Sequence, residues 1–210
     1  LNMNSNVQVI NAESLTTKVA GDLVINAAQT YSTALGLNII NTSSSNRTQI
    51  AAVTTTNNGI ISITNAGILQ LTGNITSAGA VTQSGGGTVF FGVTGSSFSI
   101  STTNDAVSFT DAVNLISNTT INSTGGNITF NNIVDGDFSF TLNASGGNVL
   151  LGGRLGFNSI GPIAVNMATT VTMLGNIFAE SLSILNASGP IVITGEMFGV
   201  TKGRTISRRL

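Results

Sequence analysis

Residues Asp135–Leu151, DGDFSFTLNASGGNVLL, carry the clearest structural pattern in the chain. Apolar and polar residues alternate from Phe138 to Leu142 and again from Asn148 to Leu151, and Asn143–Gly147 separates the two runs. Such alternation is typical of strands with one buried face, while Gly, Asn and Ser favour the turns between strands. The segment therefore predicts a strand, a short polar turn and a second strand.

The same unit recurs along the chain. The pentapeptide Leu142–Gly146 returns unchanged as Leu185–Gly189, 43 positions later. The residues just before successive strands are spaced by 18 to 22 positions; they are Gly87, Asp105, Gly126, Gly147, Thr169 and Gly189. The strand-ending Asn-Ala pairs have spacings near multiples of 20; they begin at Asn26, Asn65, Asn143 and Asn186. Both markers predict a structural repeat of about 20 residues.

A repeat of this length with two or three short strands has a direct physical interpretation. If each unit is one turn of a coil, equivalent strands lie about 4.8 Å apart in parallel ladders, and about ten units form a rod of roughly 50 Å. The inward Val, Ile, Leu and Phe side chains then form one continuous core. We therefore predict an all-β fold, a right-handed parallel β-helix with coils of about 20 residues. An antiparallel sandwich is the competing fold, but it requires no fixed period.

The pattern differs in strength along the chain. We expect one solenoid over residues 1–200, less regular in 1–58 and regular in 59–200. Residues 41–58 are rich in Thr, Ser and Asn and predict a loop or irregular coil. Residues 201–210 hold four of the seven basic residues and predict a tail or linker that breaks the repeat. Because the chain starts at Leu1, we also expect a processed protein or a piece of a longer one.

The composition narrows the classes of function. The chain has 210 residues, seven basic and eight acidic, with a net charge of −1, which gives no electrostatic footprint for nucleic acid. It has no Cys and no His, so thiolate sites, disulfides and the commonest general base are excluded. No apolar run approaches the roughly 18 residues of a membrane span, so we expect no membrane insertion. At 41% hydrophobic residues, the chain has enough apolar material for a core.

Several coils resemble a known family. The segments SGGNVLLGG, STGGNITFNN and ASGPIVITG, together with DGDFSFTLNASGG, are similar to coils of filamentous-haemagglutinin-like β-solenoids. These are the exoproteins of two-partner secretion systems and the passenger regions of autotransporter adhesins. The resemblance covers residues 59–200 well and 1–58 loosely. It implies a right-handed β-helix, a secreted or cell-surface bacterial location, and a role in adhesion or surface structure.

Few residues suggest chemistry. Asp135 and Asp137 are the nearest carboxylate pair; they are weak candidates for metal ligands or for an acid and base, because an Asp-Gly turn leading into Phe138 explains them better. We predict neither a cofactor nor a metal. Many β-helical proteins act on polysaccharides, so the candidates for such a site are Asp105, Asp111, Asp135, Asp137 and Arg154. With no Trp and a single Tyr, we predict that the chain is not an enzyme.

The sequence thus leaves two functions open in different classes. The first is an extracellular adhesin or exoprotein segment whose rigid surface meets a host or cell-surface ligand. The second is a structural subunit of a self-assembling filament, sheath or surface layer, because an uncapped solenoid end exposes unpaired backbone groups. A polysaccharide-active enzyme is a third, minor alternative. The expected partners are further coils of a longer chain or a second copy stacked end to end.

Overall fold

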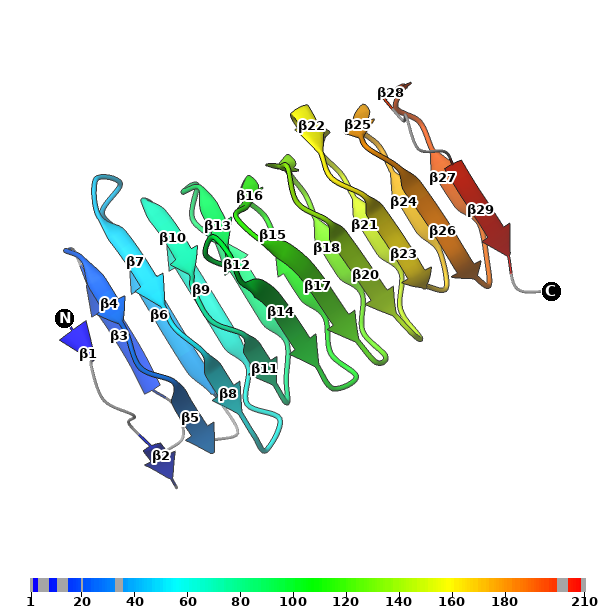
Figure 1. Ribbon diagram of the computed structural model, residues 1–210. Coiled ribbons are helices and arrows are strands. Elements are labelled where there is room, and N and C mark those ends of the chain that lie inside the picture. Colours follow the sequence, from blue (N-terminus) through cyan, green and yellow to red (C-terminus); the bar gives the residue numbers. More distant parts are fainter. Residues whose placement is uncertain are drawn as a thin grey trace.

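The computed structural model shows an all-β coil of three parallel sheets (Figure 1). It describes residues 2–3, 8–10, 15–19, 21–32, 36–199 and 204–208. All regular structure in these ranges is strand. Each full turn of the coil contributes one strand to each sheet, and each strand pairs in parallel with the third strand along the chain. The predicted β-solenoid is confirmed, and its right-handed winding remains a prediction.

The three sheets are named A, B and C in chain order. Sheet A contains β1(Asn2–Met3), β4(Leu23–Ile25), β7(Arg47–Ile50), β10(Ile68–Leu71), β13(Val89–Phe91), β16(Val113–Leu115), β19(Val134–Gly136), β22(Leu155–Ile160), β25(Ile177–Ala179) and β28(Met197–Phe198). Sheet B contains β2(Gln8–Ile10), β5(Gln29–Ser32), β8(Val53–Thr55), β11(Ile75–Ser77), β14(Ser97–Thr102), β17(Asn118–Ser123), β20(Phe140–Ala144), β23(Ile163–Met167), β26(Leu182–Ala187) and β29(Arg204–Arg208). Sheet C contains β3(Leu15–Val19), β6(Leu37–Asn41), β9(Ile61–Asn65), β12(Val81–Ser84), β15(Val107–Phe109), β18(Ile128–Phe130), β21(Val149–Leu151), β24(Val171–Met173) and β27(Ile191–Ile193).

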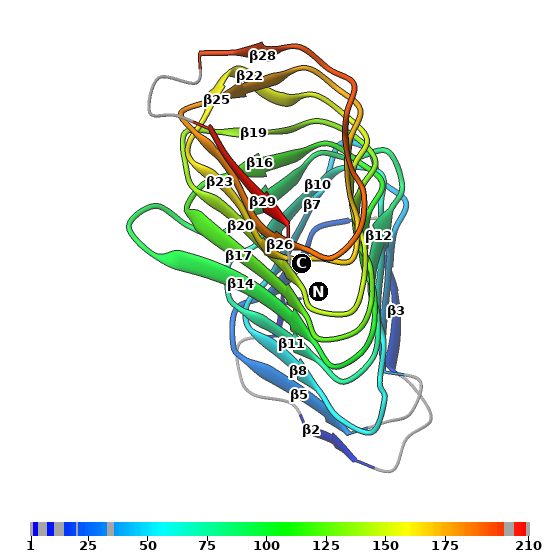
Figure 2. The ribbon, with the colours of Figure 1, turned by 90° about the vertical axis from the view of Figure 1, so that its right-hand side faces the viewer.

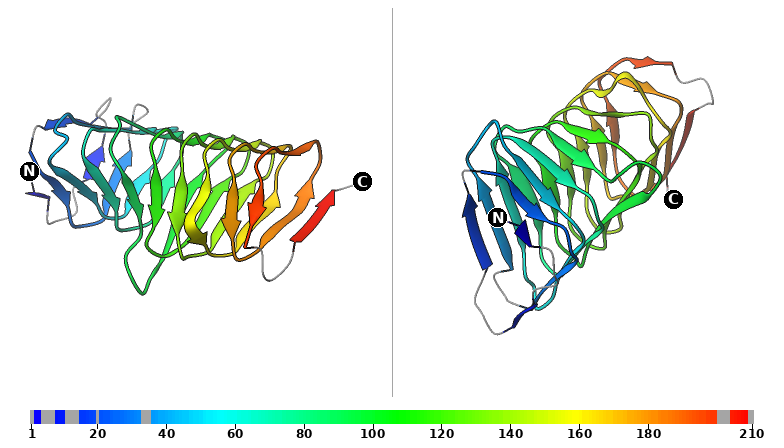
Figure 3. Two further views of the ribbon diagram at one scale, coloured as in Figure 1. Left: turned by 90° about the horizontal axis from the view of Figure 1, so that it is seen from above. Right: turned by 60° about the vertical axis from the view of Figure 1, so that its left-hand side comes forward.

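The strands of each sheet stack along one axis. Figure 2 shows the coils nearly end on, and Figure 3 places the two termini at opposite ends of the stack. Val107 pairs with Ile128, and Ile128 pairs with Val149, so these coils are 21 residues long. Thr48 pairs with Leu23, 25 positions earlier, so coil length varies where the corners take extra residues.

One apolar core runs through the coil. Most strands alternate buried and partly exposed positions, as β21 and β24 do, and the buried residues are chiefly Val, Ile, Leu and Phe. Five phenylalanines meet in the middle of the stack: Phe91, Phe98, Phe109, Phe130 and Phe140. Phe109 and Phe130 stack with ring centroids 5.4 Å apart. Because such rings bury large apolar areas, this cluster anchors the central coils.

Buried polar side chains form a column at the corner between sheets B and C. Ser77, Thr102 and Ser123 occupy equivalent positions in successive coils, and Ala144 follows them. Their hydroxyls bond to corner carbonyls: Ser77 donates to Gly59 O at 3.1 Å and Ser123 to Gly126 O at 2.7 Å. Small side chains fit this tight corner, and their hydrogen bonds offset the cost of burying them.

The prediction of a loop over residues 41–58 is wrong. This segment contains β7 and β8, which pair with neighbouring strands on both sides. The inward positions include Thr48 and Thr55, both buried. Thr48 Oγ1 accepts a bond from Asn41 Nδ2 at 2.9 Å, and Thr55 Oγ1 donates to Gly59 O at 2.5 Å. The alternation is not visible in the sequence, because the residues at these inward positions are polar and are buried only through hydrogen bonds that the fold supplies.

The residues that marked the repeat in the sequence do not all occupy equivalent positions in the coils. Asp105, Gly126, Gly147, Thr169 and Gly189 each precede a strand of sheet C, whereas Gly87 precedes β13 of sheet A. In sheet C, β12 begins at Val81 and pairs with Val107, 26 positions later. The Asn-Ala pairs fall in or just after strands of all three sheets. The period was right because most of its markers lie on one sheet.

Two further segments mark the outline of the coil. Within the expected basic tail, β29 pairs in parallel with β26, so its backbone continues sheet B where the sequence suggested a tail or linker. The loop Gly92–Ser96, between β13 and β14, projects from the side of the stack (Figure 2). The loop is closed by Ser96 N, which donates to Val93 O at 3.2 Å.

Candidate functional site

The outer face of sheet A carries one irregular strand, β22. Val134 and Gly136 of β19 lie two positions apart, yet they pair with Leu155 and Ile160, which lie five positions apart. The next strand returns to normal spacing, since Leu155 pairs with Ile177 and Ile160 with Ala179. Gly156–Ser159 therefore forms an outward bulge, which we call the strap. Bulges of this kind are common where a strand re-aims side chains beside a functional site.

Arg154 fastens the strap from one side. Its Nε donates to Gly156 O at 2.8 Å, and its Nη2 donates to Phe157 O. The guanidinium lies 4.6 Å from the ring centroid of Phe157 and 4.4 Å from that of Phe178. Phe178 in turn stacks on Phe198 at 4.6 Å. The cation between two rings gains both hydrogen bonds and cation–π attraction, which together fix its position.

Asp135 holds the strap from the other side. Its Oδ1 accepts a bond from Phe157 N at 2.6 Å. Phe157 is thus fixed through both its N–H and its C=O, while 59% of its side chain is exposed. A large apolar side chain held outward by two charged partners is pre-ordered for contact with another molecule, because little conformational freedom remains to be lost.

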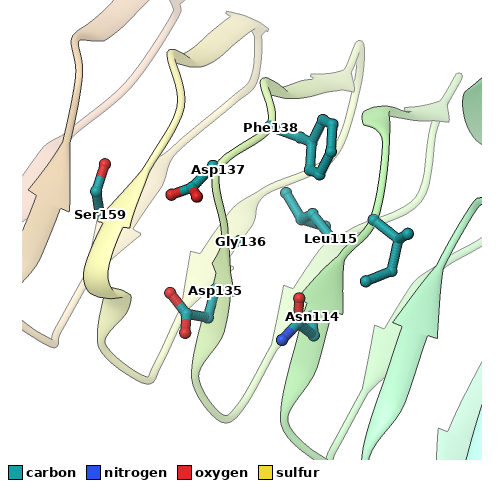
Figure 4. A pocket seen from close by; sticks show the side chains of 8 residues that line it. Asn114, Leu115, Asp135, Gly136, Asp137, Phe138 and Ser159 are labelled. Carbon is teal, nitrogen blue, oxygen red and sulfur yellow. The ribbon is translucent and has the colours of Figure 1, made fainter. Parts of the chain in front are cut away.

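A pocket of about 340 Å³ opens beside the strap (Figure 4). Its lining comes from three neighbouring coils: Asn114, Leu115, Ile116, Asp135, Gly136, Asp137, Phe138 and Ser159. Figure 4 shows the carboxylates of Asp135 and Asp137 directed toward the strand that carries Ser159, with the Phe138 ring on the side of Leu115. No basic side chain belongs to this lining. The pocket therefore offers oxygen acceptors, one amide, one hydroxyl and an aromatic wall.

The pair Asp135 and Asp137 lies in a different local geometry from the one expected. Asp135 belongs to β19 and points outward, and the bend comes after it, at Asp137–Phe138. Gly136 has a φ of 113°, which turns the chain between the two carboxylates. An added Cβ at Gly136 would lie 2.3 Å from Leu115 O, so only glycine fits this turn. Both carboxylates still line the same pocket.

Metal binding stays an untested alternative for this pair. Asp135 already accepts the Phe157 N–H, and among the described residues no group of three or more His, Cys, Asp or Glu side chains is arranged to hold an ion. Two carboxylates supply fewer oxygen atoms than the six to eight ligands that Ca²⁺ takes.

The other candidate residues lie at different corners. Asp105 is at the corner between sheets B and C, where its main-chain O accepts bonds from Thr102 and Ser123. Asp111 is at the corner between sheets C and A, where its Oδ2 accepts from Gln83 Nε2 at 2.6 Å and from Gly86 N at 2.8 Å. Of the five candidates, the structure thus brings together Asp135, Asp137 and Arg154, all around the strap.

Several site residues were not singled out from the sequence, among them Asn114, Phe157 and Ser159. Asn114 is an ordinary outward strand residue, aligned with Asp135 by the ladder. A signal for the strap was present, because Gly152–Gly161 interrupts the alternation with four glycines and one Arg. The alignment of these residues across coils, which makes the pocket, depends on strand register.

None of the protein-family models, curated proteins or solved structures compared with this chain matches it. Within the described ranges, the structure has no helix that is both long enough and apolar enough for a membrane span. The chain is thus a parallel β-solenoid whose sheet A carries the strap and the adjacent pocket on its outer face.

Proposed function

We propose that this chain is the rod segment of an extracellular bacterial adhesin or exoprotein. The observation that carries the proposal is the strap: a stiff parallel coil holds an exposed Phe157 and an adjacent pocket on one outer face. Residues with no role in the core and a fixed outward position suit contact with a partner. The resemblance of residues 59–200 to filamentous-haemagglutinin-like coils supports the same class and the secreted or surface location.

The proposed mechanism is presentation. Ten strands in sheet A at about 4.8 Å per step give a rod of about 43 Å, and one apolar core runs through its coils. Side chains on the outside of such a rod keep fixed distances from one another, so a partner meets a pre-formed surface. Asp105 and Asp111 lie at other corners, so only Asp135 and Asp137 of the four candidate carboxylates share the pocket, and Asp135 already accepts the Phe157 N–H. We expect the chain to be no enzyme.

Two measurements test the proposal. Antibodies to the chain should detect it in the medium or on the surface of the cells that produce it, and beads coated with the purified protein should adhere to cells. Beads coated with the same protein after heat unfolding provide the control, since they share composition but lack the surface. Detection in the cytoplasm alone, or equal adhesion by folded and unfolded protein, would contradict it.

A structural subunit of a filament or surface layer is the second candidate. The parallel ladder supports it: Val171 pairs with Ile191 and Met173 with Ile193, and a coil of a second copy can pair with this chain through the same backbone hydrogen bonds. Electron microscopy separates the two candidates, because long uniform filaments support assembly and isolated rods of about 43 Å support the adhesin segment.

A further inference from the structure

The lining of the pocket indicates its ligand class. Its volume of about 340 Å³ lies at the lower end of the range for small-molecule sites and suits one or two sugar rings. Asp135 and Asp137 accept hydrogen bonds, and the amide of Asn114 and the hydroxyl of Ser159 can donate and accept. Such a set matches a molecule with many hydroxyl groups, each of which can donate and accept in turn.

The polar groups that face the pocket retain bonding capacity. Among the residues that the structure describes, the side chains of Asn114 and Asp137 have no hydrogen-bond partner. Asp137 is exposed, and Asn114 is partly exposed. Their unused oxygen and nitrogen atoms come from two adjacent coils, so one ligand can bridge them without a change in the backbone.

The aromatic groups complete the match. Phe138 lines the pocket, and the exposed Phe157 belongs to the strap that borders it, bonded through its N–H to the lining residue Asp135. The C–H face of a sugar ring packs on apolar aromatic surface while its hydroxyls turn to polar groups. The pocket holds two carboxylates and no basic side chain, so phosphates, sulfates and acidic sugars are disfavoured by repulsion.

We propose that the pocket between Asn114, Asp137 and the strap binds a neutral saccharide. This inference deepens the proposed function, on which it rests, by naming the class of cell-surface ligand. Asp137 and Asn114 bond to sugar hydroxyls, and Phe138 and Phe157 contact its C–H face. Arg154 and Asp135 are positioning residues that hold Phe157 outward.

The test begins with the purified folded chain on an array of immobilised neutral and acidic oligosaccharides, followed by titration calorimetry with the neutral sugars that bind. Asp137→Asn and Phe157→Ala should each lower affinity about tenfold, the loss expected for one charged hydrogen bond or one apolar contact. The matched controls are Asp105→Asn, a carboxylate at the corner between sheets B and C, and Ile60→Ala, an exposed apolar side chain several coils away; both should bind as wild type. Circular dichroism confirms that each variant folds.

The outcomes separate this inference from the adhesin proposal. Binding of neutral sugars that only the pocket variants lose supports it, whether or not coated beads adhere to cells. The absence of neutral-sugar binding overturns it, as does binding that both pocket variants retain or a preference for acidic sugars. Calcium ions and free lysine are titrated in parallel. Binding of either one, with no binding of any sugar, would also overturn the inference. If beads coated with either pocket variant still adhere to cells, the adhesin proposal holds and the adhesion does not depend on the saccharide site.

Discussion

Leu142 and Leu185 occupy the first position of identical pentapeptides but lie on opposite sides of sheet B. Leu142 is fully buried, whereas Leu185 is 37% exposed. Leu142 pairs with Val165, and Val165 pairs with Ile184, so the inward position of the later coil belongs to the residue before Leu185. A register shift enters the ladder after Leu142, and Ala168 still bridges Ala187 at the corner. One extra residue thus turned the repeated leucine outward.

This relationship predicts unequal costs for the same substitution. Leu142→Ala should lower the free energy of unfolding by about 2–5 kcal/mol, because it leaves a cavity in the core. Leu185→Ala should change it by less than about 0.5 kcal/mol, as expected for a surface position. Chemical unfolding followed by circular dichroism measures both. Equal losses would show that the two copies are equivalent, contrary to the structure.

Gly146 and Gly147, in the turn within Asp135–Leu151, predict a second pair of unequal effects on stability. A Cβ at Gly147 would lie 2.0 Å from Gly126 O, because neighbouring coils touch there through their backbones. Gly147→Ala should therefore destabilise the protein by about 3 kcal/mol. At Gly146 the nearest atom to a Cβ is 3.5 Å away, so Gly146→Ala should be neutral or stabilise by about 0.5 kcal/mol. Thermal unfolding of both variants checks the prediction, and a larger loss at Gly146 would contradict it.

Tyr31 predicts a response to alkaline pH. Burial raises the pKa of Tyr31 to about 12, above the value of about 10 for an exposed tyrosine. The unfolded chain loses its proton first, so stability is full below about pH 10 and falls as the pH rises from 10 to 12. Tyr31→Phe should remove this slope. It should not weaken the protein at neutral pH, because the Tyr31 hydroxyl has no hydrogen-bond partner among the described residues.

The measurement for Tyr31 is unusually clean. It is the single tyrosine in a chain without tryptophan, so phenolate absorbance reports this side chain alone. Titration of the folded protein should give a midpoint near pH 12, and titration in denaturant one near pH 10. A folded midpoint at 10 would show that the side chain is solvated, and the alkaline slope should then be absent.

The hydrogen bonds of Asp111 predict that its carboxylate stabilises the fold and does not serve a ligand. Its Oδ2 accepts from Gln83 and from Gly86 N, and Gln83 also donates to Asn65 Oδ1 at 2.8 Å. Asp111→Ala leaves these donors without their acceptor and should cost about 1–3 kcal/mol. Asp137→Ala, which removes an exposed carboxylate without such bonds, is the control and should leave unfolding unchanged. Similar midpoints for the two variants in urea would count against the network.

The projecting loop predicts a site that tolerates insertion. Thr94 and Gly95 are exposed, and an added Cβ at Gly95 would meet nothing within 4 Å. Five flexible residues inserted after Thr94 should cost about 1 kcal/mol or less, since lengthening a surface loop adds little closure entropy. The same insertion between Gly146 and Gly147 should disrupt the ladder. Comparison of soluble yield and melting temperature tests this, and equal tolerance at both places would be the contrary result.

The candidate site was only partly accessible from the sequence. Asp135, Asp137 and Arg154 were recognised as chemically suggestive, because charged residues are rare in this chain. Their grouping around Phe157 was not, because it requires the strap and the alignment of three coils. Local alternation shows which residues share a face, but it carries no information on which coil partner lies beside them.

The sequence by itself determined the fold class, the repeat near 20 residues and the apolar identity of the core, because strand alternation and glycine-rich turns act locally. The tertiary structure alone decided the register. Thr48 and Thr55 are buried because bonds from Asn41 and to Gly59 satisfy them, so a segment without visible alternation forms two strands. One extra residue leaves two consecutive side chains outward, as at Leu185 and Asn186, before Ala187 turns inward again. A period of two cannot reveal where a coil accommodates such a residue.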